Sequence, residues 1–296
     1  MMEYGENDRY TEAFGKYNLI VSEENASRTV EKIRSRKSEP TKDELAKLLG
    51  CIDYTSLKPT DSDETILEMT GKINRLFSSH PDIPAFAAIC VYPCYAEIVS
   101  KSLEIEDIHT ACVSGGFPSS QTATEVKIAE TAMAIHDGAD EIDIVMPVGR
   151  FLSGEYEYIA DEMQELKDVC GDRILKVILE TSFLGDLANV KKAAIMAMYS
   201  GADFIKTSTG KENSTATPEA FLVMCQAIKE YAAETGRKVG IKAAGGISTI
   251  NDAFLYYRIV KEILGKEWLN RLLFRIGTSR LAGQLIAEIC GEKDVI

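Results

Sequence analysis

Long apolar segments are missing from this chain of 296 residues, and none reaches the length of a membrane-spanning helix. Positive charge is also scarce: 33 Lys and Arg stand against 46 Asp and Glu, which gives a formal net charge of -13. This excess of negative charge argues against partners such as nucleic acids and anionic membranes. The first residues, MMEYGENDRYTEAF, are polar and acidic and lack the apolar core of a signal peptide.

Residues that commonly bind metals or form disulfide frameworks are few and scattered. The three histidines, His80, His109 and His136, lie far apart in the sequence, so we predict no metal site. The seven cysteines follow no regular spacing, and Cys90 and Cys94 in CVYPC do not form a C-x-x-C motif. We therefore expect reduced thiols in the core of a cytoplasmic protein.

Two nucleotide-binding motifs are also absent. No G-x-G-x-x-G follows the first predicted strand. The pair Gly210-Lys211 does not belong to a P-loop, because the earlier glycine is missing and Glu212 replaces the required Ser or Thr. The sequence therefore offers no motif that supports a nucleotide-binding site.

The chain does contain enough apolar sequence for a full core, with 45% apolar and 27% charged residues. Short apolar segments alternate with longer amphipathic ones along most of it. The eight predicted strands cover residues 51–55, 86–91, 109–114, 141–146, 174–180, 202–207, 239–244 and 273–278. Eight strands that alternate with helices favour an α/β fold of the (β/α)8 TIM-barrel type. An open doubly wound sheet is the alternative.

Several predicted helices have recognisable ends. Thr41 opens the capping-box pattern TKDE, so we expect a helix over residues 41–49. Residues 122–138 have apolar positions at steps of three and four. Residues 217–236 begin with a threonine cap and place Pro218 at the first helical position.

The first forty residues differ from the rest of the chain. They carry many charges and four aromatic residues at roughly helical spacing, namely Tyr4, Tyr10, Phe14 and Tyr17. We interpret residues 1–40 as an N-terminal helical extension that packs on the main body. Residues 41–296 are then expected to form a single barrel domain.

Two lysines, Lys206 and Lys242, are each preceded by isoleucine in neighbouring predicted strands. Matching positions on neighbouring strands lie about 5 Å apart. Two ammonium groups at that separation repel by roughly 3 kcal/mol at an effective dielectric of ~20, which corresponds to about 2 pKa units. Burial lowers a lysine pKa as well, and a lysine near neutrality can form a Schiff base with a carbonyl. The alternative is that each lysine only pairs with a carboxylate.

Carboxylates occur in the same set of strands. Asp143 lies on the fourth strand in EIDIV, and if it points inward it faces the two lysines, where it can assist proton transfer. It can instead balance the charge of Lys176 on the fifth strand, and both roles are compatible. Asp53 on the first strand is a weaker candidate, for which we favour a structural hydrogen-bonding role.

Glycine-rich loops follow the last two strands. In a (β/α)8 barrel these loops commonly bind phosphate, because glycine lets backbone N–H groups approach the anion and helix N-termini add a positive field. The segments are AAGGIST at 243–249 and GTSR at 277–280. Possible donors and cations at these loops are Thr278, Ser279, Lys211 and Arg280.

Taken together, these segments resemble the deoxyribose-phosphate aldolase family of class I Schiff-base aldolases. The matching stretches run in family order over about residues 50–285: IDYTSLKPT, AAICVYP, VSGGFPS, EIDIVMPVGRFLSG, LKVILET, GADFIKTSTGK, GIKAAGGI and RIGTS. The resemblance implies that Lys206 forms the Schiff base, that Lys242 lowers its pKa, and that Asp143 shuttles protons with a water, supported by Lys176. It also implies a phosphate site at Gly210, Lys211, Gly245, Gly246 and Ser279, with Thr209 and Asp53 as supporting residues.

The chain departs from the family pattern in three places. The segment KAAGG replaces the more frequent K-P-A-G-G or K-A-S-G-G, and Arg280 stands where some members have a second serine. The chain ends in KDVI, whereas some members end in a tyrosine that reaches the site. We expect these differences to affect rate and substrate range more than reaction type.

The resemblance implies cleavage of 2-deoxy-D-ribose 5-phosphate to D-glyceraldehyde 3-phosphate and acetaldehyde without a cofactor, with small-molecule sugar phosphates and aldehydes as the partners. It also implies a homo-oligomer, most simply a dimer. Two alternatives stay open. One is another class I aldolase acting on a different phosphorylated sugar, and the other is a sugar-phosphate-binding barrel that has lost catalysis.

Overall fold

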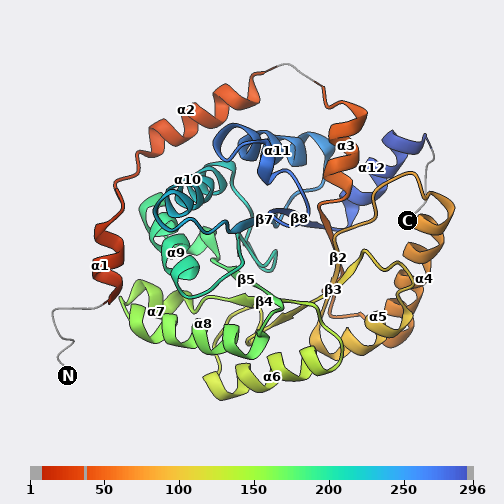
Figure 1. Ribbon diagram of the computed structural model, residues 1–296, viewed down its shortest axis with the longest axis horizontal. Coiled ribbons are helices and arrows are strands. Elements are labelled where there is room, and N and C mark those ends of the chain that lie inside the picture. The colour runs from red at the N-terminus through yellow and green to blue at the C-terminus, as the bar shows by residue number, and fades with distance from the viewer. Residues whose placement is uncertain (1–8, 37–38, 292–296) are drawn as a thin grey trace.

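The protein was analysed as a computed structural model, which describes residues 9–36 and 39–291. Eight parallel strands close into a barrel in sequence order, and helices surround it (Figure 1). The strands are β1 (Ile52–Thr55), β2 (Ala88–Val91), β3 (His109–Ser114), β4 (Glu141–Val145), β5 (Ile174–Ile178), β6 (Phe204–Lys206), β7 (Gly240–Ala244) and β8 (Phe274–Thr278). The (β/α)8 prediction is confirmed, and closure between β1 and β8 excludes the open sheet.

The helices around the barrel bury their apolar faces against the strands. They are α3 (Lys42–Leu49), α4 (Asp63–Ser79), α5 (Ala96–Ser102), α6 (Thr124–His136), α7 (Val148–Leu152), α8 (Tyr156–Cys170), α9 (Leu187–Tyr199), α10 (Pro218–Thr235), α11 (Ile250–Ile263) and α12 (Arg280–Cys290). Thr41 forms both halves of the predicted capping box with Glu44. Thr217 caps α10, and Pro218 occupies its first turn. These local signals therefore set the helix ends as expected.

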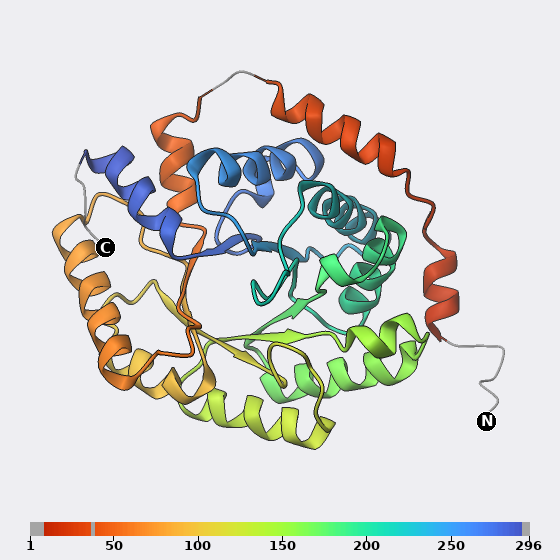
Figure 2. The same cartoon turned by 180° about the vertical axis from the view of Figure 1, so that it is seen from behind.

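Two more helices precede the barrel, α1 (Arg9–Gly15) and α2 (Glu23–Arg34). They run along the outside of the helical ring, with α1 against α8 and α9 and α2 against α10 and α11 (Figures 1 and 2). Tyr10, Phe14 and Tyr17 are buried there, and the Tyr17 hydroxyl lies 2.9 Å from the Tyr199 hydroxyl. Tyr4 lies outside the described residues. These buried aromatic residues therefore attach the extension to the helices of the barrel.

The barrel interior differs from the layer between strands and helices. Along β4, Ile142 and Ile144 join the main apolar core outside the barrel. The alternate residues Glu141 and Asp143 are fully buried and lie among charged side chains from other strands. Because side chains alternate along a strand, one sequence supplies both an apolar outer face and a charged inner face.

Candidate active site

The barrel register brings together the lysines and the carboxylate that the sequence singled out. Lys206 on β6 stands opposite Lys242 on β7. Asp143 on β4 stands opposite Lys176 on β5. All four side chains are at most 3% exposed. The structure therefore confirms that Lys206 and Lys242 occupy matching positions on neighbouring strands.

Asp143 is the centre of this group, because three lysines donate to its carboxylate. Lys206 and Lys242 each place their Nζ 2.8 Å from Oδ2. Lys176 places its Nζ 2.7 Å from Oδ1. Asp143 thus holds the two neighbouring amines at one oxygen while its other oxygen is fixed by the third lysine.

A deeper layer of charge supports Asp143, and the sequence reasoning missed most of it. Arg275 on β8 donates to Asp53 at 2.6 Å and, through Nη2, to Glu141 at 2.7 Å. Glu141 also lies 2.6 Å from the Nζ of Lys176. The available signals were Glu141, which shares a strand face with Asp143, and Arg275, whose position pairs in register with Lys242.

Asp53 belongs to this network more closely than expected. We favoured a structural hydrogen-bonding role, but its carboxylate lies 2.5 Å from the Nζ of Lys242 and is fully buried. Arg275 contacts its other oxygen. Asp53 therefore shares Lys242 with Asp143 and acts on the charge of the site as well as on its geometry.

We call these buried side chains the charged cluster: Asp53, Glu141, Asp143, Lys176, Lys206, Lys242 and Arg275. The cluster contains three carboxylates and four basic groups. If Lys206 is neutral, three anions face three cations. Because a buried net charge is costly, the arrangement favours the neutral amine on Lys206.

The direction of each pKa shift agrees with this count. Burial lowers the pKa of Lys206, Asp143 opposes that change, and the charge of Lys242 adds to it. Burial is therefore the main cause of the lowered pKa of Lys206, and repulsion by Lys242, the first cause expected from the sequence, is smaller. For Lys242, burial acts in the same direction but Asp143 and Asp53 outweigh it, so its pKa is raised. Lys206 is thus the amine of this pair that deprotonates more readily.

The carboxylates stay ionised for the complementary reason. Burial alone would raise the pKa of Asp143, but Lys176, Lys206 and Lys242 hold it well below the ordinary value. Burial opposes the ionised form of Glu141 too, and Lys176 and Arg275 outweigh it, so its pKa is also well below the ordinary value. The cluster can therefore keep fixed negative charge beside a neutral amine.

The loops after β6 and β7 meet at their glycines. A Cβ placed on Gly210 would lie 3.6 Å from the Cα of Gly245, and one on Gly245 would lie 2.8 Å from the carbonyl oxygen of Ser214. Gly210, Gly245 and Gly246 all have positive φ. Glycine is therefore required where the two loops approach each other, next to the barrel mouth.

The other residues predicted for phosphate binding lie around the same mouth. Lys211 follows Gly210, and its Nζ reaches across to the carbonyl oxygen of Leu57. Ser279 precedes α12 and makes no capping hydrogen bond with its side chain, and Arg280 is exposed. Thr278 instead ties β8 to the β7 loop by donating to the Ile247 carbonyl. The KDVI terminus lies outside the described residues.

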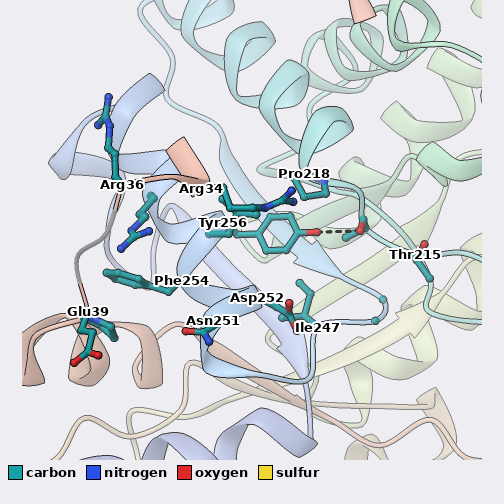
Figure 3. Close-up of a pocket in the computed structure, with 16 residues that line it drawn as sticks. Arg34, Arg36, Glu39, Thr215, Pro218, Ile247, Asn251, Asp252, Phe254 and Tyr256 are labelled. Carbon is teal, nitrogen blue, oxygen red and sulfur yellow. Dashed lines mark hydrogen bonds between the residues drawn. The ribbon is translucent and has the colours of Figure 1, made fainter. Parts of the chain in front are cut away.

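A cavity of about 910 Å³ lies on the outer side of the Gly245-Gly246 loop. Its lining comes from the loop itself, the start of α10, α11 and the end of the N-terminal extension (Figure 3). The hydroxyl of Tyr256 donates to the Ala216 carbonyl at 2.9 Å and closes one side. No side chain of the charged cluster lines it. Its lining does include Gly245 and Gly246 of the barrel mouth.

Within residues 9–36 and 39–291, no group of three or more His, Cys, Asp or Glu is arranged to hold a metal ion. Five of the seven cysteines are buried. In the part of the chain that the structure describes, no helix is both long enough and apolar enough to cross a membrane.

Comparison with known proteins places this chain among aldolases. A family described as DeoC/LacD family aldolase matches residues 49–262. The deoxyribose-phosphate aldolase of Bos taurus is 38% identical over 277 residues, which cover 88% of this chain and 86% of the relative. The Homo sapiens deoxyribose-phosphate aldolase is 38% identical over 275 residues, with the same two coverages.

Solved structures extend this likeness to the fold. The tetrameric deoxyribose phosphate aldolase from Aeropyrum pernix superimposes with a TM-score of 0.64 at 25% identity, covering 88% of this chain and 97% of that one. The family match covers more than half of the chain, and the mammalian relatives match it over most of their length. This chain therefore belongs to the DeoC/LacD family of aldolases.

Proposed function

We propose that the protein is a class I aldolase that cleaves 2-deoxy-D-ribose 5-phosphate reversibly to D-glyceraldehyde 3-phosphate and acetaldehyde. The observation that carries the proposal is the buried Lys206, whose pKa is lowered and whose neutral form balances the charged cluster. A neutral buried amine is the nucleophile that Schiff-base chemistry requires. The names of the mammalian relatives support the choice of substrate.

The reaction begins when the Nζ of Lys206 attacks the C1 aldehyde of the open-chain sugar. Loss of water gives an iminium, which accepts the electron pair of the C2–C3 bond as that bond breaks. The C3 hydroxyl gives up its proton and becomes the aldehyde of D-glyceraldehyde 3-phosphate. The two-carbon fragment stays on Lys206 as an enamine. Because the iminium is the electron sink, the cleavage needs neither a metal nor an organic cofactor.

The second half of the reaction is a proton transfer followed by hydrolysis. The enamine takes a proton at C2 and becomes the iminium of acetaldehyde, and water then releases acetaldehyde and restores the amine. Asp143 touches the amines of both Lys206 and Lys242. We assign it, together with Lys242 and a water, to moving these protons, while Lys176 and Asp53 keep the carboxylate and Lys242 in place.

We assign the phosphate group of the sugar to the mouth formed by the β6, β7 and β8 loops. Gly210, Gly245 and Gly246 have no side chains to block an anion, and Lys211 and Ser279 lie beside them. Thr209 supports the same loop from the buried side. This placement puts a phosphate at the rim while the C1 carbonyl reaches Lys206 inside the barrel.

We also propose that residues 1–40 form an extension and residues 41–296 a single catalytic domain. The packing of α1 and α2 on the outside of the helical ring supports this division. We propose a homo-oligomer, for which a dimer is the simplest case, and the tetrameric relative supports assembly in general. The five buried cysteines, which form no disulfide, support a cytoplasmic location.

The decisive test is to trap the Schiff base. The protein is incubated with acetaldehyde or with 2-deoxy-D-ribose 5-phosphate, reduced with borohydride, and digested for peptide mass spectrometry. A reduced two-carbon adduct on Lys206 is expected. Folded protein without any adduct on Lys206 would refute the proposal, and a panel of other sugar phosphates, assayed for cleavage, identifies a different substrate.

A further inference from the structure

Glu180 is a buried carboxylate that the proposed chemistry does not use. It lies two residues after the end of β5, is 5% exposed, and has a left-handed backbone with φ 55 and ψ 54. That conformation is unfavourable for a residue other than glycine and persists only where the surroundings impose it. A carboxylate buried in strained backbone needs compensating contacts, so its partners indicate what it does.

All the hydrogen-bond partners of the Glu180 side chain come from the loop that follows Lys206. Oε1 accepts from the backbone N of Thr209 at 2.5 Å and from the hydroxyl of Ser214 at 2.7 Å. Oε2 accepts from the hydroxyl of Thr209 at 3.1 Å. Within the described residues, no lysine or arginine forms an ion pair with this carboxylate. Its charge is therefore satisfied by the loop alone.

These contacts fix the part of the loop that carries the glycine and lysine of the mouth. Thr209, held by Glu180, accepts a hydrogen bond on its Oγ1 from the backbone N of Lys211. Gly210 lies between them and contacts the Gly245 backbone. Ser182 adds a second tie, because its hydroxyl donates to the Thr215 carbonyl. The turn after β5 thus holds the β6 loop at both ends.

We propose that Glu180 is a positioning residue that shapes the β6 loop for the phosphate of the substrate and so sets the preference for phosphorylated over unphosphorylated sugars. This inference rests on the proposed function. Glu180 touches neither Lys206 nor any other member of the charged cluster in the hydrogen bonds and ion pairs of the described residues. Its loss should therefore weaken recognition of the phosphate and leave the amine chemistry unchanged.

The chain provides a matched control for the backbone. Glu212 lies in the same loop with φ 53, is exposed, and makes no hydrogen bond or ion pair within the described residues. Glu180→Gly and Glu212→Gly both remove a carboxylate and both relieve left-handed backbone, but only the first removes the loop contacts. Glu180→Gln is the conservative variant, since its amide can still accept from Thr209 and donate to the threonine hydroxyl.

The kinetic test compares 2-deoxy-D-ribose 5-phosphate with 2-deoxy-D-ribose. For Glu180→Gly we expect KM for the phosphorylated sugar to rise roughly tenfold or more, as for a lost hydrogen-bonded anchor. Its kcat/KM for the unphosphorylated sugar and its acetaldehyde adduct on Lys206 should be unchanged. Glu180→Gln and Glu212→Gly should resemble the unmodified protein. An equal loss of kcat/KM for both sugars in Glu180→Gly, or an unchanged KM for the phosphorylated sugar, would overturn the proposal.

A second measurement does not depend on turnover. Hydrogen exchange, followed with and without inorganic phosphate, should show faster exchange over residues 207–214 in Glu180→Gly than in Glu212→Gly, and weaker protection by phosphate. Equal exchange in the two variants would overturn the positioning role even if the protein cleaves a different substrate. If the unmodified protein has no aldolase activity but the two variants still differ in exchange, the proposed function is refuted and the positioning role of Glu180 is supported.

Discussion

The barrel interior and the attached N-terminal helices contain ion pairs of nearly the same length but in different surroundings. Lys242 and Asp143 lie 2.8 Å apart, with both side chains 0% exposed. Arg36 and Glu262 lie 2.7 Å apart where the extension meets α11, with side chains 49% and 43% exposed. The distances alone would suggest equal roles. The exposed fractions show that water screens the Arg36–Glu262 pair and is excluded from the pair inside the barrel.

This difference in burial decides what each pair can do. An exposed pair contributes about 0–1 kcal/mol and mainly helps to orient the extension, whose attachment comes from buried residues such as Val30 and Ile33. A buried pair need not stabilise the fold at all, because desolvation offsets the attraction. In the charged cluster the same contacts instead control which groups carry a proton. We therefore expect substitutions in the charged cluster to have large effects on catalysis, and substitutions of exposed ion pairs to have small effects on stability.

The largest expected effect is that of Lys206→Ala. Turnover should fall by on the order of 10⁴-fold or more, because no other amine can form the Schiff base in the same position. Asp143 keeps Lys176 and Lys242 as partners, so the fold should survive, as circular dichroism would show. Full activity in a folded variant would remove Lys206 from the mechanism.

Asp143→Asn should reduce both turnover and stability. The variant leaves three lysine amines without their common carboxylate, which we expect to cost about 3–5 kcal/mol of unfolding free energy. The folded pKa of Asp143 is depressed, so its contribution exists above the unfolded value and is lost as the pH falls through the folded value. Urea unfolding at several pH values should show that the difference in unfolding free energy between the unmodified protein and Asp143→Asn narrows below about pH 4.

Exposed Asp252 provides a control for that experiment, because Asp252→Asn should change the unfolding free energy far less. A difference between Asp143→Asn and the unmodified protein that stays constant from pH 7 to acid conditions would contradict the assigned pKa.

Lys242→Leu should move the acid limb of the pH–rate profile toward higher pH. The substitution removes a cation next to Lys206 and leaves Asp143 freer to hold a proton on that amine, and both changes raise its pKa. At neutral pH the rate should fall about 10- to 100-fold, which corresponds to a shift of 1 to 2 pKa units. Exposed Lys238→Leu is the control, and an unchanged profile in Lys242→Leu would exclude the coupling.

The smallest expected effect is that of Arg36→Ala on the attachment of the extension. Removal of this exposed pair should change the unfolding free energy of the α2 segment only slightly, because water screens the attraction. Ile33→Ala in the same segment, which empties a buried position, should cost about 2–5 kcal/mol. Limited proteolysis of residues 9–36 gives the readout, and a larger effect of Arg36→Ala would reverse the comparison.

Local sequence signals determined much of the molecule. The eight apolar segments became eight strands whose ends differ from the predicted ends by at most two residues, and the capping box at Thr41 formed as predicted. Lys206 and Lys242 were predicted to meet because they occupy equivalent positions on successive strands, and the register confirms it. Such signals act over a few residues or between neighbouring strands, and regular geometry is enough to extrapolate them.

The tertiary structure decided the second layer of charge and the support of the β6 loop. Arg275 contacts Asp53 across 222 residues of sequence, and this contact exists only because β8 closes against β1. Glu180 carries no signal of its own in LKVILET, and its left-handed backbone and buried partners appear only when the β5 turn meets the loop after Lys206. Sequence periodicity predicts which face of a strand a side chain occupies. Barrel closure determines which charged side chains meet in the barrel interior, and therefore which amine loses its proton.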